Sequence, residues 1–592
     1  MNRIRRSPWP ASWNRWLPKS LLCLPEYSPA TLVADAIAGV TVGLVALPLA
    51  MAFAIASGLS PQAGIYCAIV TGFTISALGG SRCQVGGPTG AFVVVIAAIV
   101  ARHGIDGLFM CTMMAGVILI AFGLGGLGST VRFIPRPVVF GFTNGIAVLI
   151  ASTQVKDFLG LTVEAVPSDF VGRARALATH LDSWTPATTI LGLTAIGLIV
   201  VARRWHFRIP GTIIALALGT VAAALLLPEA ATIGSRFGGI PMGFPPLRMP
   251  EFRADLVPTL LPSALTVALL GAMESLLSAV VSDRMTGDRH NPNVELIAQG
   301  VANVLSPIFG GLPATGAIAR TATNVRSGAR TPVAGMIHAV TLLLVLLVAA
   351  PLAQFIPLSV LAAILFVVAY DMGEWREIPA ILQLTKTDVS VWFVTFALTV
   401  FADLTVAVEV GMVLAALLFI RRVADTTTVE RVTGAYVEAG RPHSLQDKEI
   451  PPYVAIVRIH GPFLFGSSDK LLPIVDQLDS LPEIVVLRLR NMTALDGTGL
   501  LAMEDFAARL RDSGRHLLLC GTRRQPAELF ARAHVSHVFG MDNIVPDVGA
   551  ALVRASSLHA QRHGDRPGGA ASEDASGDDL HLPARAPIQA VR

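Results

Sequence analysis

The stretch GGLPATGAIAR, residues 310–320, interrupts strongly hydrophobic sequence with a break rich in glycine and proline. A shorter copy, GGPTGA at residues 86–91, lies far upstream, and in both copies Thr-Gly-Ala follows the break directly. Thr315 stands 226 positions after Thr89, and a weaker Thr-Val match repeats at an offset of 225. Matched interruptions in two halves of a membrane chain are the best pointer in a sequence to a transporter binding site. The sequence therefore predicts an internal repeat with a site at its centre.

Composition places most of the chain in a lipid bilayer. Of its 592 residues, 53% are hydrophobic and 15% are charged, and the mean hydropathy is +0.62. Soluble domains carry about 25% charged residues. Hydrophobic segments run from Leu32 to Ile420, and breaks at glycine, proline and charge clusters divide them into about fourteen spans.

The charges in the loops predict the orientation. With the N-terminus inside, alternate loops are rich in arginine and lysine, and the remaining loops are mixed or acidic. This pattern obeys the positive-inside rule with both termini cytoplasmic and an even number of spans. Two sets of seven spans then lie in opposite orientation. We expect a polytopic α-helical protein of a bacterial-type inner membrane, built as a seven-plus-seven inverted repeat.

The ends of the chain differ from this hydrophobic part. Residues 1–30 begin basic and rich in tryptophan, which suits a cytoplasmic or interfacial segment. After the transmembrane domain (31–424) and a linker (425–450), strand and helix patterns alternate, which predicts a small α/β domain at 451–555. Residues 556–592 are polar and are expected to form a disordered tail.

The two breaks predict an anion site. If both are extended, the helices that follow begin near the middle of the membrane, at Thr89 and Thr315. In an inverted repeat the two helix N-termini point toward one another, and each presents free N–H groups and about half a positive charge. The alternative is that the glycines only allow helices to pack closely.

Glu274 lies near the middle of the apolar run 260–281. Carboxylates at this depth usually face the interior of a bundle and serve ion or proton pathways. Burial disfavours the ionised form, so Glu274 can be protonated in one state and ionised in another, as proton coupling requires. Ser278 follows one turn later on the same face and is expected to hydrogen-bond the substrate or the carboxyl group. The alternative for Glu274 is a structural pairing with a neighbouring helix.

Two further polar residues lie in apolar surroundings. Arg320 stands five residues after Thr315, about 7.5 Å along a helix, and is expected to add positive potential at the anion site. The alternative is an arginine that extends to the membrane interface. His338 is interpreted as a core histidine whose hydrogen bonds are satisfied.

Other classes of site find little support in the sequence. The five cysteines are odd in number and have no CxxC spacing, which gives no disulfide or zinc framework. There is no nucleotide-binding glycine loop and no clustered His/Cys set. We therefore expect no enzymatic activity, cofactor or metal, and no nucleic-acid partner.

Three motifs closely resemble the SulP, or sulfate permease, family of anion transporters. They are ESLLSAVVSDRMTG (274–287), GGLPATGAIARTATNVRSGARTPVAG (310–335) and RFIPRPVVFGFTNGIA (132–147), and FADLTVAVEVG (401–411) also fits the family pattern. The resemblance implies core and gate domains, with half-helical third and tenth spans framing the substrate and the first and eighth spans completing the pocket. It also implies a homodimer, an acidic eighth-span position at Glu274 and a basic position near the anion at Arg320. It assigns the backbone cradle to Thr89, Gly90, Ala91, Thr315, Gly316 and Ala317.

The C-terminal domain resembles the STAS domain of sulfate transporters and anti-sigma-factor antagonists. Taken alone, the turn Asp496-Gly497-Thr498-Gly499 reads as a helix cap. In the antagonists a phosphorylated serine follows an aspartate in a similar turn, and Thr498 takes that place here. The resemblance thus implies a regulatory phosphosite at Thr498 and a domain that docks a cytoplasmic regulator or the second protomer.

The resemblance also narrows the coupling ion and the substrate. Sodium-coupled bicarbonate members tend to carry Asp at the Glu274 position and Thr near Ile318, whereas the side chain of Ile318 offers no oxygen to sodium. We therefore expect secondary active, proton-coupled uptake of sulfate. Proton-coupled dicarboxylate carriers have a similar Glu-Ser-Leu-Leu run, so four-carbon dicarboxylates and bicarbonate remain alternatives. A nucleobase carrier, an anion channel and a sensor with vestigial transport are further rivals.

Overall fold

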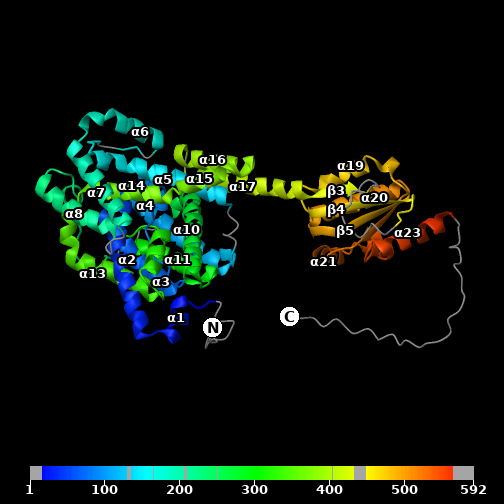
Figure 1. Cartoon of the computed structure of the whole chain (residues 1–592), viewed down its shortest axis with the longest axis horizontal. Helices are drawn as coiled ribbons and strands as arrows, with labels where there is room; N and C mark the ends of the chain where they lie inside the picture. The colour runs from blue at the N-terminus through cyan, green and yellow to red at the C-terminus, as the bar shows by residue number, and fades with distance from the viewer. Residues whose placement is uncertain are drawn as a thin grey trace. The chain divides into compact units, whose positions relative to one another are not determined.

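The computed structural model describes residues 16–129, 135–163, 166–167, 169–205, 210–247, 249, 251, 253–402, 404–432 and 449–563. The chain forms two compact units, Met1–Ala415 and Ala416–Arg592. The first unit is a bundle of helices around a large apolar core (Figure 1). Of the predicted N-terminal segment 1–30, residues 1–15 lie outside the described part.

The bundle consists of two halves with the same order of elements. Gly104 has non-helical backbone angles (φ 70°, ψ −172°) and divides α4 into two segments, so each half has seven main helical segments among the described residues. The first half contains α2 (Pro29–Ala56), α3 (Pro61–Leu78), α4 (Gly90–Leu124), α5 (Arg136–Leu159), α7 (Pro186–Arg204) and α8 (Gly211–Leu226). The second contains α10 (Val257–Thr286), α11 (Pro292–Ile308), α12 (Ile318–Arg326), α13 (Val333–Ala349), α14 (Leu358–Met372), α16 (Lys386–Phe401) and α17 (Leu404–Thr426).

Length and composition support a membrane location for this bundle. Among the described residues, eight helices are long and apolar enough to cross a membrane. Short helices connect or flank them, and these are α1 (Lys19–Cys23), α6 (Phe170–Thr179), α9 (Ile233–Phe237) and α15 (Ile378–Leu382). The predicted polytopic helical fold is confirmed.

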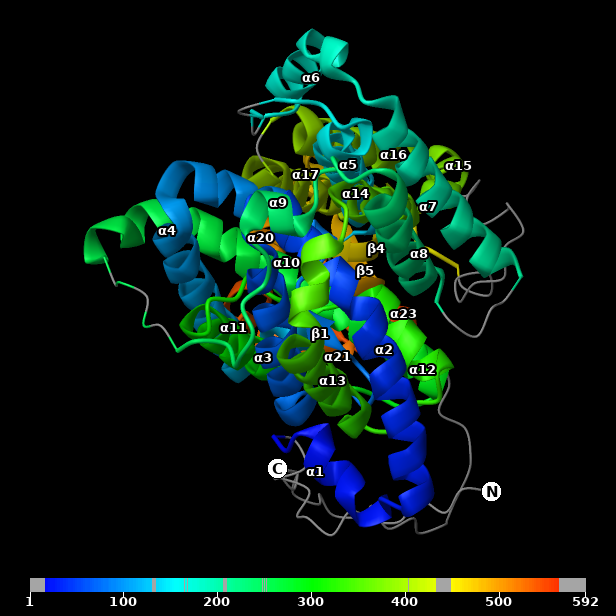
Figure 2. The same ribbon diagram turned by 90° about the vertical axis from the view of Figure 1, so that its left-hand side faces the viewer.

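The two halves interlock at the predicted breaks. The first helix of each half packs on the other half, α2 on α13 and α10 on α4. At the centre, β1 (Gly86–Gly87) pairs antiparallel with β2 (Thr315–Gly316), with Gly86 opposite Gly316 and Gly87 opposite Thr315. Figure 2 shows β1 within the bundle, beside α3. An exchange of equivalent contacts about a central pair is the arrangement of an inverted repeat.

One predicted helix start is wrong. Thr89 is the N-cap of α4, close to the prediction, but α12 begins only at Ile318, with Ala317 as its N-cap. Thr315 is instead extended in β2, and its Oγ1 donates a hydrogen bond to the Gly271 carbonyl at 2.9 Å. Because pairing with β1 holds the backbone extended through Gly316, the first helical turn forms three residues later than predicted.

Helices α2 and α3 pack so closely that a glycine is required between them. A Cβ atom at Gly64 would lie 1.9 Å from the Ala50 carbonyl oxygen, whereas a Cβ at Gly197 on α7 would meet nothing within 4 Å. We expect Gly64→Ala to destabilise the bundle by about 1–3 kcal/mol or more, because the backbones must separate. Gly197→Ala is the matched control, since it brings the same gain in helix propensity without a clash. Apparent melting temperatures of the purified proteins in detergent test this, and equal values for both variants would contradict it.

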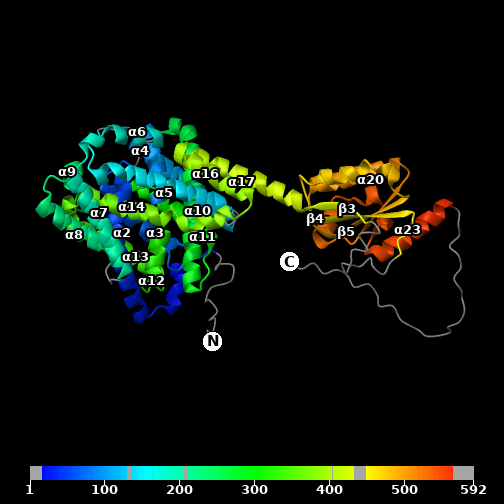
Figure 3. The same ribbon diagram turned by 45° about the horizontal axis from the view of Figure 1, so that its top comes forward.

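The second unit has a five-stranded sheet in the order β3-β4-β5-β6-β7. Its strands are β3 (Thr428–Arg431), β4 (Val454–Phe463), β5 (Ile484–Leu495), β6 (His516–Cys520) and β7 (Ile544–Val545), and all pairs except β3–β4 are parallel. Its helices are α19 (Leu472–Val475), α20 (Gly497–Asp512), α21 (Arg524–Arg532), α22 (Ser536–Phe539) and α23 (Val548–His563). Helices α20 and α23 cover opposite faces of the sheet (Figure 3).

The boundaries of this unit along the sequence differ from the predicted ones. Strand β3 lies inside the predicted linker 425–450, and α23 continues to His563, although a disordered tail was predicted from residue 556. Residues 564–592 lie outside the described part. The helix continues because its apolar residues Val548, Ala551 and Ala555 pack on the sheet.

Candidate functional site

A cavity lies in the first unit beside the two breaks. One wall comes from α2, α10, the start of α4 and the β2–α12 segment, and the facing wall comes from α5 and from α14 and the residues just after it. The lining residues are Leu49, Phe53, Thr89, Gly90, Thr143, Glu274, Gly316, Ala317, Ile318, Ala319, Arg320, Val368, Asp371, Met372 and Glu374. Residues from the two halves of the repeat thus meet at one cavity.

Glu274 connects the first break to α10. Its Oε2 accepts a hydrogen bond from the Thr89 hydroxyl at 2.9 Å, and Thr89 is the residue that caps α4. Both side chains line the cavity. The predicted carboxylate therefore lies next to a helix N-terminus, within reach of a substrate in the cavity.

Arg320 is buried and turned toward the opposite break. Its side chain is 4% exposed, its Nη1 donates to the Gly86 carbonyl at 3.4 Å, and its Nη2 donates to the Pro88 carbonyl. The alternative of an arginine extending to the membrane interface is therefore wrong. A guanidinium from the second half and a carboxylate held by the first half face the same cavity.

Fewer backbone N–H groups than predicted are available to an anion at the two breaks. The Ala317 N–H is already bonded to the Val85 carbonyl at 2.9 Å, and the Phe92 N–H bonds to Thr89. The first turn of a helix leaves its other N–H groups without intrahelical partners. At the cavity these belong to Gly90 of α4 and to the first residues of α12, Ile318 and Ala319.

Three residues of the predicted site do not line the cavity. Ala91 and Thr315 are buried in the bundle. Ser278 is also buried, and its hydroxyl lies 2.9 Å from that of Thr321, so it ties α10 to α12 and does not bond the carboxyl group of Glu274. These three residues therefore belong to the packing around the cavity and not to its lining.

A buried polar cluster behind the first break was missed in the sequence. Glu295 on α11 accepts hydrogen bonds from the Gly80 and Ser81 N–H groups at 2.9 and 3.1 Å. It also accepts from Ser275, which in turn accepts from the Gln84 amide at 2.9 Å. The cluster fixes the chain entering β1 against α10 and α11. Glu295 follows the polar stretch GDRHNPN (287–293), so it lacks the apolar surroundings in the sequence that identified Glu274.

The facing wall adds carboxylates that the sequence analysis did not name. Asp371 near the end of α14 and Glu374 just after it line the cavity. Asp371 forms an exposed ion pair with Arg203 of α7 at 2.7 Å. Both carboxylates directly follow an apolar run, where a membrane helix ends.

His338 differs from its interpretation as a satisfied core histidine. Its ring is buried on α13, and within the described part of the chain neither ring nitrogen has a hydrogen-bond partner. The ring lies against Gly72 of α3, where an added Cβ would come within 3.2 Å of Nδ1. It does not line the cavity.

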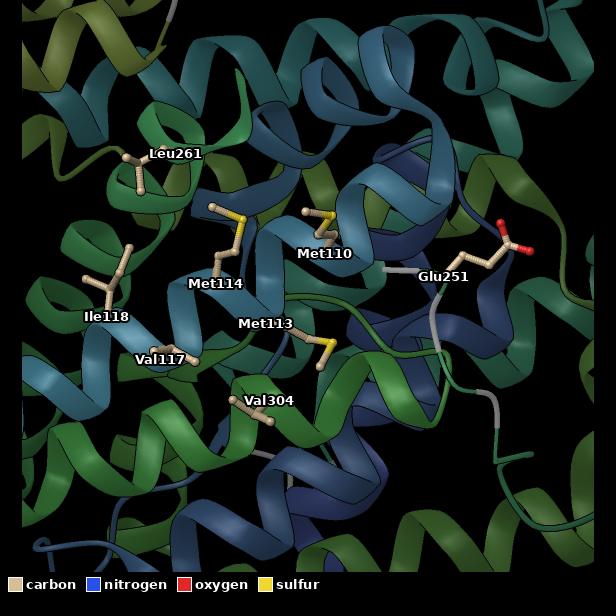
Figure 4. Close-up of a pocket in the computed structure, with 8 residues that line it drawn as sticks. All are labelled: Met110, Met113, Met114, Val117, Ile118, Glu251, Leu261 and Val304. Atoms are coloured by element: carbon tan, nitrogen blue, oxygen red, sulfur yellow. The ribbon is translucent and has the colours of Figure 1, made fainter. Parts of the chain in front are cut away.

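A second pocket of the same unit has a different character. It is lined by apolar side chains of α4, α10 and α11, including Met110, Met113 and Met114, with Glu251 at its edge (Figure 4). Among the described residues that line it, the one charged side chain is negative. An anion would find no positive partner among these residues, so this pocket does not fit the predicted site.

In the second unit, Asp496 caps α20 as expected. Its Oδ1 accepts from the Gly499 N–H at 2.8 Å and its Oδ2 from the Phe465 N–H at 2.9 Å. Thr498 is exposed in the first turn of the helix. Its hydroxyl is therefore accessible, and phosphorylation there stays a prediction.

Comparison with known proteins matches both units. The sulfate permease family matches residues 32–395, and the STAS domain matches residues 446–551. "Putative sulfate transporter YvdB" of Bacillus subtilis is 40% identical over 508 residues, covering 86% of this chain and 94% of that protein. The bicarbonate transporter BicA of Synechocystis is 33% identical over 543 residues, covering 88% and 94%.

Solved structures agree with these matches. The transmembrane domain of a cyanobacterial bicarbonate transporter BicA is 35% identical, with a TM-score of 0.60, and covers 64% of this chain and 98% of that chain. The murine Slc26a9 anion transporter in its inward-facing state has a TM-score of 0.81 at 18% identity, covering 94% and 96%, which shows a common fold.

Proposed function

The chain belongs to the sulfate permease family, and from this premise we propose that it is a secondary active transporter that takes up sulfate together with protons. The observation that carries the proposal is the placement of Arg320 and Glu274 at one cavity between the two breaks. A buried guanidinium and two helix N-termini attract an anion. These groups select a ligand by its negative charge more than by its shape, which suits a small inorganic anion.

Glu274 supports the coupling to protons. An ionised carboxylate in the same cavity repels an entering anion, and a proton on Glu274 removes that charge. The proton and the anion therefore favour each other's binding, and this coupling is reciprocal by thermodynamic necessity. The side chain of Ile318, which lines the cavity, offers no oxygen atom, and hard cations such as sodium prefer oxygen ligands.

Bicarbonate is the second candidate substrate. The similarity to proteins named bicarbonate transporters extends over most of this chain. Four-carbon dicarboxylates are a third candidate, because the cradle is mostly backbone and small side chains.

We also propose, from the family resemblance and the loop charges, a homodimer of the inner membrane with cytoplasmic termini and a STAS domain that docks a regulator.

Uptake into proteoliposomes tests the proposed function. We expect labelled sulfate to accumulate under an inward proton gradient, and to do so less when the gradient is collapsed. Competition by unlabelled bicarbonate and fumarate measures selectivity, and protein-free liposomes give the background. Bicarbonate uptake without sulfate uptake would transfer the assignment to bicarbonate. Sulfate flux that only equilibrates and ignores the proton gradient would indicate a channel and contradict coupling.

A further inference from the structure

We propose that Glu483, His559 and His563 of the second unit form a binding site for a divalent transition metal ion, with Zn²⁺ the best match. One ligand atom from each residue lies within 4.8 Å of the other two. His559 Nδ1 is 2.8 Å and His563 Nε2 is 3.3 Å from the same carboxylate oxygen, Oε2 of Glu483. Two imidazole nitrogens and one carboxylate oxygen therefore converge on one point.

The fold explains this convergence. His559 and His563 are one turn apart on α23, and residues at this spacing share a helix face. The same face carries Ala551 and Ala555, which pack on the sheet. His559 therefore continues the packed face to the end of the sheet where the central strand β5 begins, and Glu483 stands directly before that strand.

Neighbouring groups hold the ligands in place. Tyr453 stacks on His559 with ring centroids 3.9 Å apart and planes inclined by 3°. Arg562 lies 3.5 Å from the other carboxylate oxygen, Oε1, and also donates to the Gly514 carbonyl at 2.7 Å. The arginine thus orients the carboxylate and leaves Oε2 to the two histidines. Partners of this kind fix the orientation of metal ligands in proteins.

The donor set indicates the kind of ion. Two histidines and one carboxylate are a known ligand set of zinc, with a water molecule in the fourth position. Coordination uses neutral imidazoles. In the competing reading each neutral ring donates an N–H to Oε2 of Glu483, and that reading predicts no Zn²⁺ binding.

The three side chains are accessible from solvent. Glu483 is 14% exposed, His559 34% and His563 54%. An ion could therefore enter without unfolding the domain. Once bound, it would fix the last turn of α23 to the start of β5, joining the end of the described chain to the sheet.

The test uses the full-length protein, purified in detergent with a tag that contains no histidine and stripped with a chelator. Co²⁺ is added first, because its absorption spectrum reports the coordination geometry, and Zn²⁺ then displaces it in competition. We expect one equivalent of Zn²⁺ per chain, bound at least 10-fold more weakly in Glu483→Gln, His559→Gln and His563→Gln. The substitutions to glutamine keep hydrogen-bonding capacity, so the domain stays folded.

A matched control separates this site from adventitious binding. His516 is exposed at the start of β6, and its N–H donates to the Glu483 carbonyl at 3.0 Å, but its side chain is not part of the cluster. His516→Gln should bind Zn²⁺ as the unchanged protein does. Zn²⁺ should also slow hydrogen exchange in the last turns of α23.

Failure to bind one equivalent of Zn²⁺, or binding that persists in all three cluster variants, would overturn the inference. An equal loss in His516→Gln would do the same. Because no readout depends on transport, the result is independent of the proposed function.

Discussion

Glu274→Gln should lose proton-driven sulfate uptake down to the level of protein-free liposomes, while sulfate still binds. In the unchanged protein the Thr89 hydroxyl donates a hydrogen bond to Glu274 at 2.9 Å. The glutamine keeps an oxygen that can accept this hydrogen bond. It is neutral, as the protonated carboxyl group is, so it does not repel the anion. It has no proton to release, and the cycle that returns the empty carrier cannot be driven by a pH difference. Uptake is measured over a series of proton gradients, and binding is measured on the same preparation.

The control for this experiment neutralises a carboxylate elsewhere in the same unit. Asp106 is exposed on α4 beyond the break at Gly104 and does not line the cavity. Asp106→Asn should transport as the unchanged protein does. Gradient-driven uptake that survives in Glu274→Gln would remove the coupling role proposed for this residue.

Arg320→Gln is expected to weaken sulfate binding by about 10- to 100-fold. Hydrogen bonds to charged groups contribute about 1.5–3 kcal/mol, and each 1.4 kcal/mol changes an equilibrium constant about tenfold. Arg320 is 4% exposed, so solvent screens its charge little. The dissociation constant for sulfate, measured by titration, and the KM for uptake should rise together.

Arg320 also donates to the carbonyls of Gly86 and Pro88, so a structural effect must be separated from an electrostatic one. Arg320→Lys keeps the positive charge but loses the planar fork, and it should recover part of the affinity. Arg326→Gln, on the exposed side of the same helix, should leave affinity unchanged. If Lys and Gln at position 320 weaken binding equally, the positive charge is not what binds the anion.

The fold could be predicted because many residues along the sequence contribute to each pattern that indicates it. Long apolar runs indicate membrane helices, and repeated glycine-rich breaks indicate an inverted repeat, since each signal depends on many residues at once. The start of α12 could not be read in this way. It is decided by the pairing of Gly86 with Gly316, a contact between residues 230 positions apart. No local pattern reports that a Thr-Gly pair is held in a strand and not in a first helical turn.

The site residues likewise fall into those that the sequence could identify and those that depend on contacts between distant residues. Glu274 and Arg320 were found because charged residues are costly in apolar sequence, and the structure brings both to one cavity. Ser278 was assigned from helical spacing alone, which gives its face but not its partner, and that partner is Thr321. His559 and His563 were passed over because both lie within residues 556–592, which were predicted to form a disordered tail, whereas packing on the sheet keeps α23 helical to His563.

The pairing of β1 with β2 limits how the cavity can open. The positive groups of both halves lie on one hydrogen-bonded unit, so drawing the halves apart would break backbone hydrogen bonds where no water replaces them. Sliding that unit past α5 and α14, which supply Thr143, Val368 and Met372, breaks none of these bonds. If the halves stay joined at this pair, the two half-helices move as one body relative to the wall formed by α5 and α14.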